Sequence, residues 1–81
     1  MNKSIDRLRC QFGLTPAEAR LAFHIVKGET LRSAAVELSI SYETARSHLK
    51  NIFGKTGTCR QAQLVMIILT ALPECLEAAR S

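Results

Sequence analysis

The segment from Ser41 to Lys55 places cationic and polar side chains beside an apolar row at helical spacing. Its polar side carries Arg46, Ser47 and Lys50. Its opposite side is apolar and comprises Ala45, Leu49, Ile52 and Phe53. A guanidinium group can bind O6 and N7 of guanine together, and ammonium and hydroxyl groups can bind neighbouring bases or phosphates. A helix of this length, about 20 Å, can cross the major groove of DNA. The chemistry on offer is therefore hydrogen bonding to nucleic acid.

Two predicted helices and the turn between them would position this polar side. Residues 31–38 form a short helix capped by Thr30, and residues 42–54 form a longer one capped by Ser41. The three residues 39–41 that join them have the length of a helix-turn-helix turn, with Ile40 directed to the core. In such a pair the first helix braces against the DNA backbone and the second lies in the major groove.

The predicted contacts divide into base readers and backbone clamps. The expected base readers lie on the 42–54 helix and are Glu43, Arg46, Ser47 and Lys50. Caps and helix N-termini present donors to phosphate oxygens, so a second set is expected on the DNA backbone. These residues are Thr30, Arg32, Thr44, Lys55 and Arg60. Glu43 also suits the positive end of the helix dipole, and His48 could equally contact a phosphate or pack at the edge of the core.

Further helices are expected on either side of this pair, which makes the chain all-α. Thr15 and Glu18 frame a capping box, with Pro16 at the first helical position, and this helix continues to Gly28. Another capping box, Thr58 with Gln61, predicts a helix to about Leu72. We expect residues 1–13 to be an N-terminal segment, either a packed helix or a linker helix. Residues 14–72 would then be the helix-turn-helix domain and 73–81 a tail.

The charge, the cysteine spacing and the apolar runs of the sequence limit the functions that the protein could have. The 81 residues carry a net charge of +4 with a sequence pI of about 9.4, which suits a polyanionic partner. The three cysteines lack C-x-x-C spacing, which favours a reducing cytoplasm over a disulfide framework or zinc site. No apolar run is long enough for a membrane span. We expect that the protein is not an enzyme and has no cofactor or metal site, because the sequence shows no nucleophile–base pair, phosphate-binding glycine loop or ligand cluster. We interpret His24 as a structural residue.

An ordered set of residues resembles the LuxR-type helix-turn-helix domain of NarL- and GerE-like regulators. The set is Leu14-Thr15-x-x-Glu18, Gly28, Ala35-x-x-Leu38-x-Ile40-Ser41-x-x-Thr44, His48, Ile52, Lys55, Arg60 and Leu64-Val65. The resemblance covers roughly residues 14 to 69. It implies a four-helix domain that binds double-stranded DNA as a homodimer on paired half-sites and regulates transcription. It also implies that the third helix reads the groove and the fourth forms the dimer. Further partners would be an upstream sensory domain or RNA polymerase.

The last predicted helix is apolar nearly all round, which fits a dimer contact. One stripe, formed by Leu64, Ile68 and Ala71, can close the domain core. A second stripe would be exposed on a monomer and is the predicted dimer interface: Val65, Leu69, Leu72 and Leu76. The opposite assignment of the two stripes stays open, as does burial of the whole helix by the N-terminal segment.

Two other functions are compatible with these patterns. A sigma-factor region that recognises promoter elements uses a similar helix pair. A protein-interaction module could instead bind another regulator through the apolar last helix and make no contact with DNA. Replacing Arg46 and Lys50 would separate the last possibility from DNA binding, since only operator binding should suffer.

Overall fold

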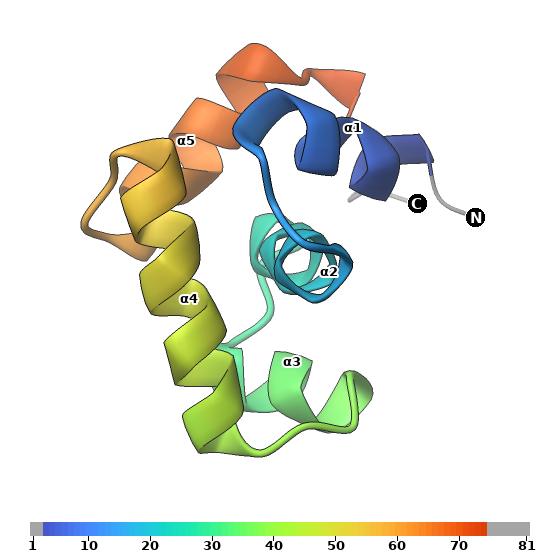
Figure 1. Cartoon of the computed structure of the whole chain (residues 1–81), viewed down its shortest axis with the longest axis vertical. Helices are drawn as coiled ribbons and strands as arrows, with labels where there is room; N and C mark the ends of the chain where they lie inside the picture. Colours follow the sequence, from blue (N-terminus) through green and yellow to red (C-terminus); the bar gives the residue numbers. More distant parts are fainter. Residues whose placement is uncertain (1–2, 75–81) are drawn as a thin grey trace.

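Five helices follow one another along residues 3–74, the part of the chain that the structure describes, and no strand occurs there (Figure 1). In this computed structural model their bounds are α1 Lys3–Phe12, α2 Pro16–Val26, α3 Leu31–Glu37, α4 Tyr42–Thr56 and α5 Gln61–Ala71. The prediction of an all-α chain is therefore confirmed. None of these helices combines the length and the apolar character that crossing a bilayer requires.

The start and the end of α2 follow the local chemistry of the sequence. The Thr15 hydroxyl accepts the Glu18 N–H at 3.2 Å, and the Glu18 carboxylate accepts the Thr15 N–H at 2.9 Å. The predicted capping box is thus present. At the other end Gly28 adopts the left-handed conformation, with φ of 91°, and its N–H donates to the Ile25 carbonyl. This turn sends the chain directly from α2 into α3.

The turn between α3 and α4 also contains a residue in the left-handed conformation, but this residue is not a glycine. Ser39 has φ of 58°, the one positive φ outside glycine among the described residues. Its N–H donates to the Val36 carbonyl at 3.1 Å, and the Ile40 N–H donates to the Ala35 carbonyl at 3.0 Å. These two bonds define a Schellman motif, in which the residue after the left-handed position packs back on the helix. Ile40 accordingly packs against the core.

Helix α2 lies at the centre of the molecule, viewed nearly end-on in Figure 1, and the other helices surround it. The largest fully buried side chains come from four of the five helices and from the residue after α5: Leu8, Leu21, Ile52, Leu64, Ile68 and Leu72. Leu8 belongs to α1, so the N-terminal segment contributes to the same core as the rest. That segment is a packed helix.

The start of α5 differs from the prediction. The capping box of Thr58 and Gln61 does not form, because α5 begins two residues later, with Arg60 at the N-cap and no side-chain cap bond. The buried Thr58 hydroxyl pairs instead with that of Thr56 at 2.9 Å. Gln63 accepts the Cys59 N–H at 3.0 Å and so satisfies a donor that precedes the helix.

The faces of α5 are also only partly as predicted. Leu64 and Ile68 are buried, as expected, whereas Leu72 is only 2% exposed and cannot belong to an open interface. Leu72 ends the helix and lies beside Asp6 and Cys10 of α1. The other predicted interface residues differ: Val65 and Leu69 are half-buried, Ala71 of the expected core stripe is exposed, and Leu76 lies outside the described residues. The outward apolar residues are Met66 and Ile67.

Candidate nucleic-acid interface

Helix α4 runs along one edge of the molecule and is fixed there by its apolar side (Figure 1). Ala45 and Ile52 are fully buried and Leu49 is nearly so, while Phe53 packs against the core from its edge. With 15 residues the helix is about 22 Å long. The predicted division of this helix into an anchored side and a free side is therefore confirmed.

The four predicted base readers share the free side of α4. Glu43, Arg46, Ser47 and Lys50 stand at positions i, i+3, i+4 and i+7, which fall on one face of a helix. All four are exposed, and together they line one shallow hollow in the surface. Within residues 3–74, Arg46 and Lys50 form no ion pair, so both cations are available to an external partner.

The first turn of α4 is held by its cap. The Ser41 hydroxyl accepts the Thr44 N–H at 3.1 Å and donates to the Thr44 hydroxyl at 2.9 Å. The extended backbone of Ser41, with ψ of 157°, is the usual N-cap conformation. These contacts fix the direction in which Glu43 and the following turn leave the protein surface.

A contact across the turn between α3 and α4 was not predicted. The guanidinium carbon of Arg32, on α3, lies 4.6 Å from the centre of the Tyr42 ring at the start of α4. This cation–π contact holds a positive charge beside the N-terminus of α4. Periodicity gives no signal for it, because the two residues belong to different helices.

The residues predicted to contact the DNA backbone are all exposed, but one of them forms an ion pair within the protein. Thr30 caps α3, where its hydroxyl accepts the Ser33 N–H at 3.0 Å, and Thr44 is partnered by Ser41. Arg60 stands exposed at the start of α5 and has no ion pair with another residue of the described chain. Lys55 is different.

Lys55 forms an ion pair within the protein that was not predicted, while its contact with a phosphate stays a prediction. Its ammonium group lies 2.6 Å from the Glu18 carboxylate on α2. The Glu18 side chain is 4% exposed and that of Lys55 37%. Burial is the largest influence on the pKa of Glu18 and raises it, but Lys55 and the Thr15 N–H together outweigh burial. The pKa of Glu18 is therefore lower than its ordinary value.

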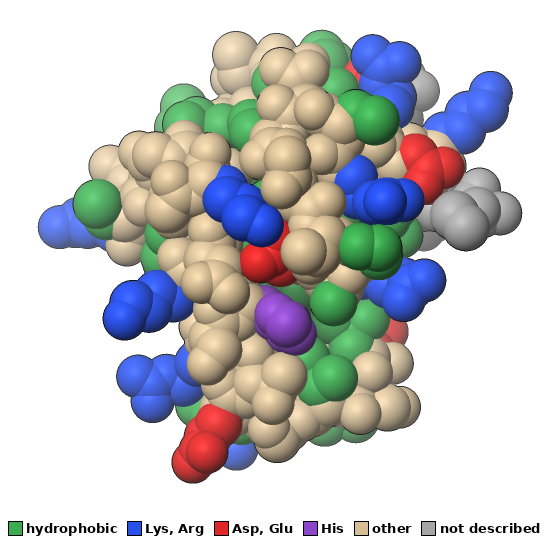
Figure 2. Space-filling model, in the orientation of Figure 1, with side chains coloured by type: hydrophobic (Ala, Val, Ile, Leu, Met, Phe, Trp, Pro, Cys, Tyr) green, Lys and Arg blue, Asp and Glu red, His purple; other side chains and the backbone are tan. Residues whose placement is uncertain are grey.

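Positive side chains gather on the surface beside the outer face of α4. Lys and Arg side chains project from the edge formed by α4 and the loop after it, at the left of Figure 2, with an acidic side chain at the lower end of that edge. His48, also on α4, is half-buried and lies between the core and the surface. The outer side of α4 thus offers positive charge and hydrogen-bond donors to a partner with exposed acceptors.

No family model, curated protein or solved structure matches this chain.

Proposed function

We propose that this protein is a sequence-specific DNA-binding regulator that inserts α4 into the major groove and acts as a homodimer. The observation that carries the proposal is the outer face of α4, where Arg46 and Lys50 stand exposed without an ion pair to any described residue. Their spacing along an anchored helix suits hydrogen bonding to successive base edges. The resemblance of the ordered residue set to LuxR-type domains supports the same function.

Residues of α3 and α5 near α4 support an additional contact with the DNA backbone. Arg32 and Arg60 bring two more cations to this side of the chain, neither of them paired with an acid within residues 3–74. Thr30 and Thr44 place hydroxyls at the helix starts. Phosphate contacts of this kind fix the register of a reading helix. Lys55 is not included, because Glu18 already neutralises it.

The proposed dimer contact is the outward apolar face of α5. Met66 is 70% exposed, Ile67 stands beside it, and Val65 and Leu69 flank them half-buried. A second copy meeting this face would remove it from water and place two α4 helices on one duplex. The same exposed face favours a second candidate, a module that binds another regulator through α5.

Selection of bound duplexes from a random pool tests the proposal, since it reports half-site sequence, symmetry and spacing together. On the selected duplex the Arg46→Ala and Lys50→Ala variants should each lose roughly 1–3 kcal/mol of binding free energy. Arg9→Ala removes the same charge from α1, away from α4, and should bind almost as the wild type does. Selection of no sequence at all, with partner binding through α5 retained, would favour the second candidate.

Salt dependence gives an independent measure. Four cations of each protomer that form no ion pair in the described part of the chain are proposed at the interface: Arg32, Arg46, Lys50 and Arg60. A dimer would neutralise about eight phosphates, so the logarithm of the binding constant should fall with the logarithm of salt concentration with a slope of roughly −7. A flat response would exclude the electrostatic part of the proposal.

A further inference from the structure

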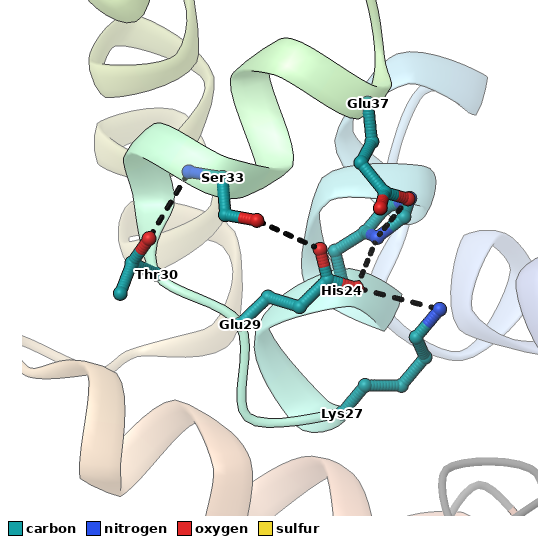
Figure 3. A network of polar contacts seen from close by, with 6 residues as sticks. All are labelled: His24, Lys27, Glu29, Thr30, Ser33 and Glu37. Carbon is teal, nitrogen blue, oxygen red and sulfur yellow. Dashed lines mark hydrogen bonds and ion pairs between the residues drawn. The ribbon is translucent and has the colours of Figure 1, made fainter.

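Three segments bring metal-binding side chains together on the side of α3 that faces α2 (Figure 3). His24 belongs to α2, Glu29 to the loop after it, and Glu37 ends α3. His24 Nδ1 lies 2.7 Å from one Glu29 carboxylate oxygen and 3.8 Å from one oxygen of Glu37. One ligand atom from each residue lies within 4.8 Å of the other two.

The local fold sets up this cluster before any ion arrives. The left-handed Gly28 turns the chain so that Glu29 returns beneath the end of α2, where its N–H donates to the His24 carbonyl at 3.2 Å. The Ser33 hydroxyl donates to the other Glu29 oxygen at 3.5 Å. That bond leaves the first oxygen directed at the imidazole, as Figure 3 shows.

We propose that His24, Glu29 and Glu37 bind a divalent transition-metal ion of the zinc class. An imidazole nitrogen with two carboxylate oxygens is a ligand set that zinc accepts, and the two carboxylates neutralise its charge. With ligand bonds of about 2.0–2.2 Å, atoms on a tetrahedral ion stand roughly 3.3 Å apart. The observed separations of 2.7 and 3.8 Å lie on either side of this value, so small side-chain movements suffice.

In the proposed site the ion lies where the hydrogen bond between His24 and Glu29 now runs. The neutral imidazole binds it through Nδ1 and carries its proton on Nε2, and water completes the coordination. The Glu29 carboxylate is already directed at Nδ1 of His24, at 2.7 Å. The His24 side chain is only 13% exposed, which limits competition from bulk water.

Lys27 would compete with a metal ion for the Glu29 carboxylate. Its ammonium lies 3.4 Å from the same Glu29 oxygen that faces His24, and 5.4 Å from the centre of the Phe23 ring. A bound metal ion must displace this positive charge from Glu29. Removing the charge should therefore strengthen metal binding, whereas a merely structural network would gain no affinity for metal.

Titration with Zn²⁺ in the absence of DNA, followed by NMR of the histidine rings, tests the site independently of the proposed function. The chain has two histidines, so His48 on α4 serves as the internal reference. The His24 ring resonances should shift and saturate at about one equivalent of zinc, while those of His48 stay in place. A hundredfold excess over Kd should raise Tm by roughly 10 °C.

Two variants and a control sharpen the test. Glu37→Gln replaces a ligand that is 55% exposed by an isosteric amide, so the protein should fold while zinc affinity falls at least about tenfold. Lys27→Met should tighten binding a few-fold, and Asp6→Asn, which removes a carboxylate on α1, should change nothing. The proposal is overturned if the His24 resonances do not move throughout the titration, or if Glu37→Gln binds zinc as the wild type does.

Discussion

Replacing Lys55 with methionine should lower the free energy of unfolding by about 1–2 kcal/mol. The methionine keeps most of the aliphatic stem but leaves the buried Glu18 carboxylate with only the Thr15 N–H as a partner. Hydrogen bonds to charged groups contribute about 1.5–3 kcal/mol, and losing one partner of a fully buried ion pair costs about 3–5 kcal/mol. We expect a loss near the bottom of the lower range, because solvent screens an ammonium group that is 37% exposed.

Urea unfolding of matched variants measures this effect. Lys50→Met removes the same group from the same helix, at a position without an ion pair in the described chain, and should stay within about 0.5 kcal/mol of the wild type. Glu18→Gln preserves an acceptor for the Thr15 N–H, and the cycle with Lys55→Met should give a coupling energy of about 1–2 kcal/mol. Equal losses for Lys55→Met and Lys50→Met would refute a structural role for Lys55.

Acid provides a second view of the same pair. The pKa of Glu18 in the folded chain is lower than its ordinary value of 4.5, so folding favours its ionised form. Its contribution to stability is full above pH 4.5 and is lost as the pH falls through the lower folded-state pKa. The stability difference between wild type and Glu18→Gln should therefore be constant near neutrality and shrink below pH 4.5. An unchanged difference at acid pH would contradict the assignment.

Three further predictions concern the turn, the interface and α5. Ser39→Gly should raise the free energy of unfolding by about 0.5–1 kcal/mol in urea titrations, because the left-handed backbone at this position strains a serine but not a glycine. Tyr42→Leu should weaken binding of the selected duplex by about 0.5–1 kcal/mol and leave stability nearly unchanged, because Arg32 loses the ring that orients it; an equal loss in an Arg32→Ala background would contradict this cause. Met66→Glu should abolish the dimer in sedimentation experiments without unfolding the chain, and a dimer that survives would place the contact elsewhere.

Local signals in the sequence accounted for most of the helices. The Thr15–Glu18 capping box and the Ser41 cap act over three residues, and both appear in the structure as predicted. The apolar period of α4 also sufficed to separate its anchored side from its free side. Such features depend on neighbours along the chain, which is why pattern and propensity can reveal them.

The sequence did not reveal contacts that join distant segments. Glu18 and Lys55 are 37 residues apart, and only the packing of α2 against α4 brings them together. His24, Glu29 and Glu37 are closer in sequence, but their side chains meet only because the Gly28 turn folds α3 back beside α2, and the sequence shows no ligand spacing. The faces of α5 were not predictable from periodicity, because a helix that is apolar nearly all round has no preferred buried side. In the structure Leu72 is buried and lines a hollow together with residues of α1.

Repeating the duplex selection with the Arg46→Ala variant tests most directly whether the outer face of α4 reads DNA. If Arg46 binds guanine, the wild type should select a guanine at one position of each half-site. The variant should lose that preference while it keeps the remaining positions and the spacing. If both proteins select the same sequence with the same preference at every position, Arg46 does not read a base and the proposed interface is wrong.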